Sequence, residues 1–321
     1  MNSGDSENCI KGLSDLPAEH APTVSICMIT YNQEAYIAKA IDGAVEQDVP
    51  FNYELVIGED HSTDRTREIC IEYERKHRGV VRVLESEANL GITQNFARTL
   101  SACRGKYIAL CEGDDFWTDL SKLNKQVKFL EEHPEYAMVS GRVEIVNEEG
   151  LTPSDTSQLQ EQLLRLKSEP GFFDLLEYNM INTPTVCIRR EVIVRLADEA
   201  TVLRRGYCID YWYWLRIASM NRIFIADDVY ASYRVHPEGA SRHSTFLRKR
   251  MPGIRHDAIS HYLSEHNDVT DSEKAVLFSS MAGIVNGHGI CHGQRIRSLL
   301  WCVSNLTLLR AWLRYRQRRI S

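Results

Sequence analysis

Three carboxylates crowd into four residues of this chain, in the run Glu112-Gly113-Asp114-Asp115. They follow the apolar segment 107–111, which is long enough for one buried strand. Carboxylates this close repel one another, so they need either a hard divalent cation or the protonation of one member. The alternative is an acidic turn that caps the helix after it. The cluster itself leaves both interpretations open, and the elements around it must decide between them.

Strand and helix patterns alternate on either side of this cluster. The predicted strands span 23–30, 53–57, 80–85 and 107–111, and the predicted helices span 35–46, 65–77, 92–102 and 120–132. Such alternation favours an α/β domain with a mainly parallel sheet and right-handed crossovers. Ligands of these sheets bind at the carboxyl ends of the strands, which is where the carboxylate cluster falls.

The second half of the chain is patterned less regularly. Residues 147–170 are polar and predict a loop, and loops of this length often cover a functional site. The other predicted elements are a strand at 136–146, a helix at 172–179, a strand at 185–188, a helix at 210–218, strands at 222–226 and 229–234, and helices beyond 245.

Composition describes an ordinary globular protein. The chain has 321 residues, 43% of them apolar, and a net charge of −6. Nine Cys form no Cys-x-x-Cys pair, and Cys27, Cys111 and Cys187 sit in apolar runs, which favours a reducing compartment. Residues 1–20 lack the apolar core of a signal peptide, and no stretch reaches the roughly 20 apolar residues of a spanning helix. We therefore expect a cytoplasmic catalytic body.

Two polar turns follow the first two predicted strands. The first carries Thr30, Tyr31 and Glu34, and the second carries Glu59 and Asp60. An aromatic face can stack on a base, and a carboxylate can accept hydrogen bonds from a base or a ribose. No Gly-x-Gly-x-x-Gly follows the first strand, so a dinucleotide cofactor is not expected. In the same turns, a purely structural role in turns and helix caps is the favoured interpretation for Ser62 and Asp64.

Taken in order, these pieces resemble the inverting glycosyltransferase family 2, whose members have the so-called GT-A fold. The resemblance covers roughly residues 22 to 240, and its matching segments are 24–34, 59–64, 89–91 and 112–115. It implies a nucleotide-diphosphate sugar as donor, usually a uridine one. It also implies a GT-A nucleotide-binding domain with a mostly parallel central sheet flanked by helices, followed here by a C-terminal helical region.

The resemblance also implies roles for single residues. Thr30, Tyr31 and Glu34 would line the nucleoside pocket, and Asp60 would meet the base. Asp114 and Asp115 would hold Mg²⁺ or Mn²⁺, which neutralises the charge that develops on the departing diphosphate. Glu112 stands where many members carry Asp, so Glu112 and Asp114 are also expected to contact the ribose or the donor sugar. Which of the three carboxylates bind the metal stays open.

Two later segments also match the family. Asp210, in the run Gly206 to Arg216, is at the place of the catalytic base that accepts the proton of the acceptor hydroxyl. His236, in Tyr233-Arg234-Val235-His236, would approach the metal or the diphosphate, with a structural histidine as the alternative. Arg234 is a weaker candidate for phosphate contact.

The C-terminus carries a basic tail. The apolar segment 299–313 ends in several arginines, and from Arg295 onward there are seven Arg and no Asp or Glu. Such a helix either lies on an anionic membrane surface, as a peripheral contact, or packs against the catalytic domain or a second subunit of a homo-oligomer. Nucleic acid is not expected as a partner, because the chain is acidic as a whole and the arginines lack stacking platforms.

The sequence therefore predicts an inverting, metal-dependent glycosyltransferase that acts on a hydroxyl of a glycan or a lipid-linked glycan, as in cell-surface polysaccharide synthesis, at the inner face of the membrane. Its expected regions are an N-terminal extension at 1–21, a GT-A domain at 22–245 and a helical region at 246–321. Within the GT-A domain, 22–146 would bind the nucleotide sugar and 147–245 the acceptor. A sugar nucleotidyltransferase and a non-catalytic nucleotide-sugar scaffold are the alternatives.

Overall fold

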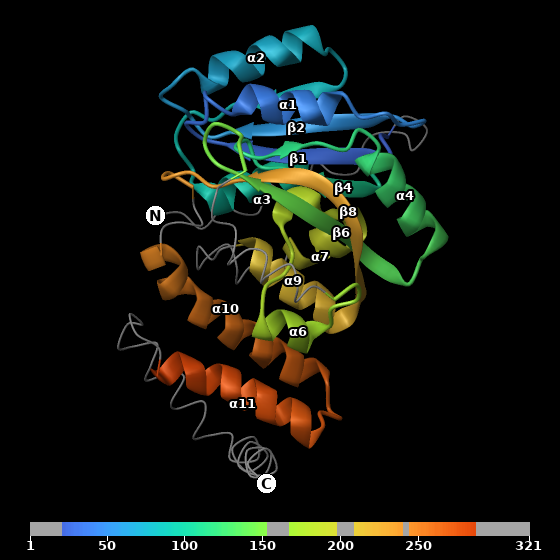
Figure 1. Ribbon diagram of the computed structural model, residues 1–321, viewed down its shortest axis with the longest axis vertical. Helices are drawn as coiled ribbons and strands as arrows, with labels where there is room; N and C mark the ends of the chain where they lie inside the picture. The colour runs from blue at the N-terminus through green and yellow to red at the C-terminus, as the bar shows by residue number, and fades with distance from the viewer. Residues whose placement is uncertain (1–20, 153–166, 198–208, 240–243, 287–321) are drawn as a thin grey trace, which may run out of the picture. The chain divides into compact units, whose positions relative to one another are not determined.

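The computed structural model describes residues 21–152, 167–197, 209–239 and 244–286 (Figure 1). These residues form two compact units. The first comprises the described parts of 21–169, 180–197 and 221–236, and the second comprises 170–179, 209–220, 237–239 and 244–286. The N-terminal extension, the segment 153–166 and the basic tail lie outside the described residues, so the predictions for them remain predictions.

The first unit is built on an eight-stranded sheet with the order β3-β2-β1-β4-β7-β6-β8-β5. Strands β1 to β4 are parallel, as predicted, whereas β7 pairs antiparallel with both β4 and β6, and β5 antiparallel with β8. The strands are β1 (Val24–Thr30), β2 (Tyr53–Glu59), β3 (Val81–Leu84), β4 (Tyr107–Leu110), β5 (Phe116–Trp117), β6 (Tyr136–Val146), β7 (Cys187–Arg189) and β8 (Arg222–Arg234).

Helices cover both faces of the parallel part of this sheet. The helices of the first unit are α1 (Ile37–Val45), α2 (Thr66–Lys76), α3 (Ile92–Ala102), α4 (Lys122–Glu132), the 3₁₀ helix η2 (Thr183–Thr185) and α7 (Arg190–Ala197). Figure 1 shows α1 and α2 on one side of the sheet and α3 on the other. Strand order explains this change of side: the chain moves outward from β1 to β3 and then returns across the sheet to β4, and right-handed crossovers in opposite directions place their helices on opposite faces.

The core of the first unit consists of the apolar side chains that these elements turn inward. Strand β1 is buried along nearly its whole length, as expected for a central parallel strand. From α1, Ile37, Ala40, Ile41 and Ala44 pack into the same cluster at the spacing of one helical face. The cysteines predicted as small buried hydrophobes, Cys27, Cys111 and Cys187, are buried free thiols.

The structure corrects two sequence predictions and adds two elements that were not predicted. The predicted strands at 222–226 and 229–234 are one strand, β8. The polar pair Asp227-Asp228 between them is exposed. It lies at a bulge, where three residues of β8 stand opposite Gly141 of β6. The predicted strand 185–188 begins later, at Cys187, because the 3₁₀ helix η2 precedes it. Strand β5 and helix α7 were not predicted at all, since two residues are too few to show a period and α7 follows β7 without a turn.

The described residues of the second unit form a helical assembly. Its helices are α6 (Phe172–Glu177), α9 (Ile209–Met220), α10 (Ser244–Glu265) and α11 (Asp271–Asn286). The Phe172 ring stacks on Tyr262 with centroids 4.4 Å apart, and the buried Arg216 forms a two-pronged ion pair with Glu265, with N–O distances of 2.8 and 2.9 Å. The aromatic-rich helix predicted at 210–218 is thus confirmed as part of this assembly.

Candidate active site

The carboxyl ends of β1 and β4 meet at the point where the order of the parallel strands reverses. The chain places β2 and β3 on one side of β1 and β4 on the other. Loops that leave such a pair diverge to opposite faces and leave a crevice between them, which is the usual ligand site of open α/β sheets. The turns 31–36 and 111–115 leave the sheet here, so the topology brings the predicted nucleoside and metal segments to one edge.

The turns after β1 and β2 are hydrogen-bonded to each other. The Asn32 N–H donates to Ser62 Oγ at 3.0 Å and the Glu34 N–H to Asp64 Oδ2 at 3.0 Å, while Glu34 Oε2 accepts the Arg65 N–H at 2.8 Å. Asn32 has a φ of 52°, a left-handed conformation that Asn tolerates better than most residues. Ser62 and Asp64 therefore have the structural role favoured from the sequence, and they fix the two turns as one surface.

The predicted nucleoside residues on this surface differ in how accessible they are. Tyr31 is 43% exposed, so its ring is available for stacking, whereas Thr30 is buried and donates its hydroxyl to Gln33 Oε1 at 2.8 Å. Asp60 is 2% exposed, and its two carboxylate oxygens accept the N–H groups of Leu90 and Gly91 at 2.8 and 2.9 Å. Asp60 thus holds the Asn89-Leu90-Gly91 segment, the third matching motif, against the end of β2.

The acidic turn packs closely on the turn after β1. The Gly113 N–H donates to the Ile29 carbonyl at 3.0 Å. A Cβ atom at Gly113 would lie 2.4 Å from Gln33 Oε1 and 2.7 Å from Thr30 Oγ1, too close without displacement of those side chains. Glycine at this position therefore lets the carboxylates approach the nucleoside turn.

Two of the predicted metal ligands lie in direct contact. His236 Nε2 is 3.0 Å from Asp114 Oδ2, and the His236 side chain is 5% exposed while that of Asp114 is 20% exposed. The Tyr36 ring lies against His236 with centroids 5.0 Å apart. Asp115 instead points inward, and its Oδ1 accepts the Arg234 N–H at 2.8 Å. The fold therefore brings Asp114, Asp115 and His236 together from the ends of β4 and β8.

Electrostatics at this turn are unbalanced. Burial raises the pKa of Asp115 well above its usual value, the neighbouring carboxylates Asp114 and Glu112 raise it further, and the hydrogen bond from the Arg234 N–H only partly offsets this. These influences confirm that the three carboxylates share one local environment. A cation bound beside them would relieve this excess of negative charge.

The acidic edge offers few protein ligands for a metal ion. In the described part of the chain, no group of three or more His, Cys, Asp or Glu side chains is arranged to hold a metal ion. Asp114 and His236 nevertheless offer one carboxylate and one imidazole at hydrogen-bonding distance. Mg²⁺ and similar ions are commonly held by one or two protein carboxylates together with substrate phosphates and water, so a site with few protein ligands suits this chemistry.

Arg234 makes several contacts that the sequence did not predict. Its side chain donates to the carbonyl oxygens of Asp114, Asn147 and Glu148, and it stacks over the Tyr36 ring 4.6 Å away. A guanidinium held in this way supports the acidic turn, and its predicted contact with a phosphate stays a prediction. No signal in the sequence indicated these contacts. They join residues 36, 114, 147 and 234, which are far apart in the chain and come together only in the folded protein.

Asp210, the predicted base, belongs to the second unit. It lies in the first turn of α9, and its Oδ1 accepts the N–H of the next residue, Tyr211, at 2.7 Å. Tyr211 is buried, and its hydroxyl donates to the Leu175 carbonyl at 2.9 Å. Asp210 thus has a fixed position within its own helical unit.

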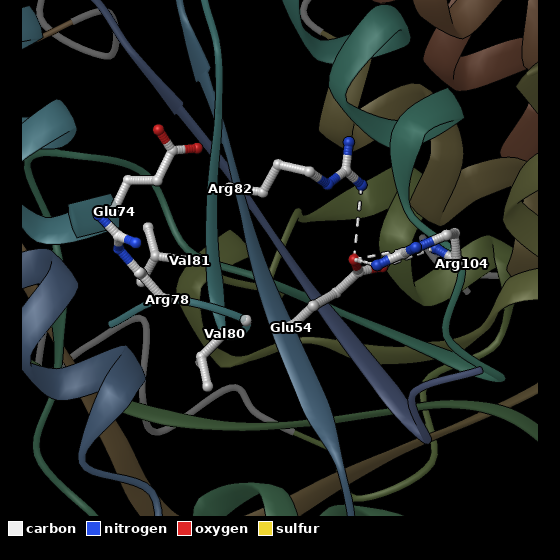
Figure 2. Close-up of a pocket in the computed structure, with 8 residues that line it drawn as sticks. Glu54, Glu74, Arg78, Val80, Val81, Arg82 and Arg104 are labelled. Atoms are coloured by element: carbon white, nitrogen blue, oxygen red, sulfur yellow. Dashed lines mark hydrogen bonds and ion pairs between the residues drawn. The ribbon is translucent and has the colours of Figure 1, made fainter. Parts of the chain in front are cut away.

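The opposite end of the parallel strands carries a separate cluster of charges. A cavity of about 310 Å³ is lined there by Glu54, Glu74, Arg78, Gly79, Val80, Val81, Arg82 and Arg104. Figure 2 shows Arg82 and Arg104 reaching Glu54, with N–O distances of 3.4 and 2.6 Å. Burial alone would raise the pKa of Glu54, but hydrogen bonds from Arg104 and Ser25 outweigh it and hold the pKa below its usual value. This cluster joins the amino ends of β1, β2 and β3 to the start of β4.

The α/β sheet and its acidic edge agree with the class of protein that the sequence resemblance predicts, the glycosyltransferases. The sequence profile of "Glycosyl transferase family 2" matches residues 25–196. An uncharacterized protein of Mycobacterium tuberculosis is 36% identical over 280 residues, which are 86% of this chain and 78% of that protein. The chain belongs to glycosyl transferase family 2, as the sequence resemblance predicted, and it is a glycosyltransferase.

Solved structures show the same fold. S. aureus TarS in complex with UDP-GlcNAc is similar with a TM-score of 0.59 and 18% identity, over 86% of this chain and 79% of that one. The mannosyltransferase PcManGT from Pyrobaculum calidifontis, in complex with GDP-Man and Mn²⁺, is similar with a TM-score of 0.58 and 17% identity, over 92% and 87%. The GT-A fold predicted from the sequence is therefore confirmed.

The helices in the described ranges were compared with the length and hydropathy of a membrane-spanning helix. None of the helices in these ranges is both long enough and apolar enough to span a bilayer. The basic helix predicted at 299–313 lies outside the described residues.

Proposed function

We propose that this glycosyltransferase is metal-dependent and inverting, and that it transfers one sugar from a nucleotide-diphosphate sugar, with uridine as the nucleoside, to a hydroxyl of a glycan or lipid-linked glycan. The observation that carries the proposal is the Asp114–His236 contact of 3.0 Å beside the buried Asp115, at the strand-order reversal. An anionic diphosphate binds poorly to such an edge unless a cation lies between them. This argument favours Mg²⁺ or Mn²⁺.

Asp114 and His236 are the ligands that the geometry favours. The bound metal would neutralise the negative charge that develops on the departing diphosphate. Asp115, also predicted as a ligand, would hold the turn in place through its bond to the Arg234 N–H. Glu112 is only partly buried and is proposed to contact the ribose or the donor sugar.

The surface formed by the turns after β1 and β2 would bind the nucleoside. The exposed Tyr31 ring would stack on the base, and Thr30 and Glu34 would line the pocket. Asp60 would act at the base edge while it holds Leu90 and Gly91. The uridine preference rests on the family resemblance and on TarS, which binds UDP-GlcNAc, although PcManGT binds GDP-Man.

Asp210 would accept the proton of the acceptor hydroxyl. The acceptor oxygen would bond to the anomeric carbon while the bond from that carbon to the diphosphate oxygen breaks, so the configuration inverts. Asp210→Asn should reduce transfer by at least about 100-fold while leaving nucleotide binding nearly intact, since a general base contributes about 10²–10⁴-fold. Transfer at the wild-type rate by this variant would rule Asp210 out as the base.

A panel of nucleotide sugars tests the whole proposal. Thermal unfolding would be followed with each donor in the presence of Mn²⁺ and in the presence of EDTA. A donor at 100 times its dissociation constant adds about 2.7 kcal/mol to the free energy of unfolding. We expect a uridine diphosphate sugar to raise the melting temperature only when Mn²⁺ is present. Stabilisation of equal size in EDTA would contradict metal dependence.

Membrane and subunit contacts complete the proposal. The helix predicted at 299–313 would either bring the enzyme to the inner face of a membrane carrying lipid-linked acceptors or form a homo-oligomer. Sedimentation with anionic and neutral vesicles would separate the two cases. Binding to anionic vesicles alone supports the membrane contact.

A further inference from the structure

Arg234, the last residue of β8, connects three segments that are far apart in the sequence. Its Nε donates to the Asp114 carbonyl at 2.9 Å, and its terminal nitrogen donates to the carbonyls of Glu148 and Asn147 at 2.7 and 3.1 Å. Its own backbone N–H donates to Asp115 Oδ1 at 2.8 Å. The residue is only 6% exposed. One buried guanidinium thus ties the acidic turn to the loop after β6.

Aromatic rings hold the guanidinium in place. It lies 4.6 Å from the centroid of Tyr36 and 5.4 Å from that of Phe116. Tyr36 in turn contacts the His236 ring. The planar group is therefore fixed by stacking above and by carbonyls at its edge, a geometry that Lys cannot reproduce because an ammonium lacks the rigid fork of donors.

The loop after β6 is shaped to present its carbonyls to Arg234. Asn147 Oδ1 accepts the N–H groups of Glu149 and Leu151 at 3.1 and 2.9 Å, and the Gly150 N–H donates to the Asn147 carbonyl at 3.0 Å. Gly150 has a φ of +81°, which favours glycine. This tight turn directs two carbonyl oxygens at one guanidinium instead of leaving them to solvent.

We propose that Arg234 is a positioning residue that sets the Asp114 carboxylate and His236 for metal binding and couples both to the 147–150 loop. The inference rests on the proposed metal-dependent function. In this role Arg234 would act through the acidic turn and not through a contact with the substrate. Its side chain fixes the main chain of Asp114, and His236 follows it by two residues, just beyond the end of β8. Loss of the guanidinium should therefore weaken metal binding more than nucleoside binding.

Binding of Mn²⁺ in the presence of UDP can be measured by electron paramagnetic resonance, because the signal of free Mn²⁺ decreases as the ion binds. Arg234→Ala and Arg234→Lys are compared with Arg142→Ala, which removes a half-buried arginine paired with the exposed Asp227 on the same pair of strands. We expect both Arg234 variants to weaken Mn²⁺ binding by about 10- to 100-fold, as loss of groups that orient metal ligands usually does. Arg142→Ala should bind as the wild type does. Circular dichroism shows whether each variant is folded. If Arg234→Ala does not fold, the Mn²⁺ affinity of Arg234→Lys is compared with that of the wild type.

Chemical rescue separates positioning from a general structural role. Guanidinium at about 20 mM should restore most of the Mn²⁺ affinity of Arg234→Ala, whereas urea at the same concentration should not, because only guanidinium replaces both the charge and the fork of donors. Wild-type Mn²⁺ affinity in Arg234→Lys would overturn the proposal. Weaker UDP binding with unchanged Mn²⁺ affinity would also overturn it and would make Arg234 a phosphate contact. If the wild-type protein binds no Mn²⁺ with UDP, the metal-dependent function itself fails.

Discussion

The two ends of the same parallel strands carry buried carboxylates in opposite electrostatic states. Asp115 at the carboxyl end and Glu54 at the amino end are each 3% exposed. The pKa of Asp115 is raised well above its usual value, whereas that of Glu54 is lowered. Burial is the largest cause of the raised pKa of Asp115, whereas at Glu54 the hydrogen bonds from Arg104 and Ser25 outweigh the effect of burial.

Glu54 is surrounded by donors within the protein. It accepts hydrogen bonds from Ser25 and Arg104, and Arg82 lies at 3.4 Å from it. Asp115 receives one backbone N–H and stands beside two further carboxylates. The amino end is therefore complete as a stabilising contact. The carboxyl end is left with negative charge that a cation would balance, which is how a ligand site differs from a structural ion pair.

The largest expected effect is on transfer, and it belongs to the carboxyl end. Asp114→Ala should reduce turnover by about 100-fold or more, because it removes the more exposed ligand of the proposed metal. Its free energy of unfolding should change by less than about 1 kcal/mol, since it also removes a repelling charge. Steady-state turnover and urea unfolding on the same preparation measure both. Full turnover would exclude Asp114 as a ligand.

The converse effect is expected for Glu54. Glu54→Gln should lower the free energy of unfolding by about 2–3 kcal/mol, because Arg82 and Arg104 lose the charge that they surround. Turnover per folded molecule should stay at the wild-type level. Glu74→Gln is the matched control: it lines the same cavity, and an amide oxygen can still accept the Val83 N–H. Equal destabilisation by both substitutions would show that Glu54 has no special role.

Acid should weaken the amino-end contact. The pKa of Glu54 is lower in the folded protein than in the unfolded chain. Its contact therefore contributes fully to the free energy of unfolding at a pH above the unfolded pKa, and this contribution is lost as the pH falls through the folded pKa. One such group changes the free energy of unfolding by at most about 1.4 kcal/mol per pH unit. Urea unfolding from pH 6 to pH 3 should show a shallower decline for Glu54→Gln than for the wild type. Parallel declines would contradict the assignment.

The smallest expected effect has the opposite sign to that of Glu54. The pKa of Asp115 is higher in the folded protein than in the unfolded chain. Its contribution to the free energy of unfolding is therefore complete at a pH below the unfolded pKa and is lost as the pH rises through the folded pKa. Asp115→Asn should therefore raise the free energy of unfolding by about 1 kcal/mol at pH 7 without metal, while the amide oxygen still accepts the Arg234 N–H. Destabilisation by this substitution in EDTA would contradict the electrostatic contrast between the two ends.

Local sequence patterns predicted the parts of the site that lie in continuous segments. The strand at 136–146 and the helix at 92–102 were predicted with the bounds that the structure has, because each shows a clear period between turn signals. The acidic turn was placed after the fourth strand on the same grounds. Family resemblance then ordered these pieces along one sheet edge.

Contacts between residues far apart in the chain could not be predicted from the sequence. Asp60 was predicted to meet a base, but its hydrogen bonds to Leu90 and Gly91 depend on the folded loop. Nothing near Arg234 in the sequence indicates that its side chain reaches carbonyls at 114, 147 and 148. Glu54 likewise is one charge at the start of a strand until Ser25 and Arg104 surround it.

Calorimetric titration with a uridine diphosphate sugar tests the central claim most directly. Wild-type protein, Asp114→Asn and Glu54→Gln would each be titrated in Mn²⁺ and in EDTA. We expect the wild type and Glu54→Gln to bind the donor only in Mn²⁺, and Asp114→Asn to bind it at least roughly 10-fold more weakly, as when a metal site is disturbed. Equal binding by the wild type in EDTA, or Mn²⁺-dependent binding that survives in Asp114→Asn, would contradict the claim.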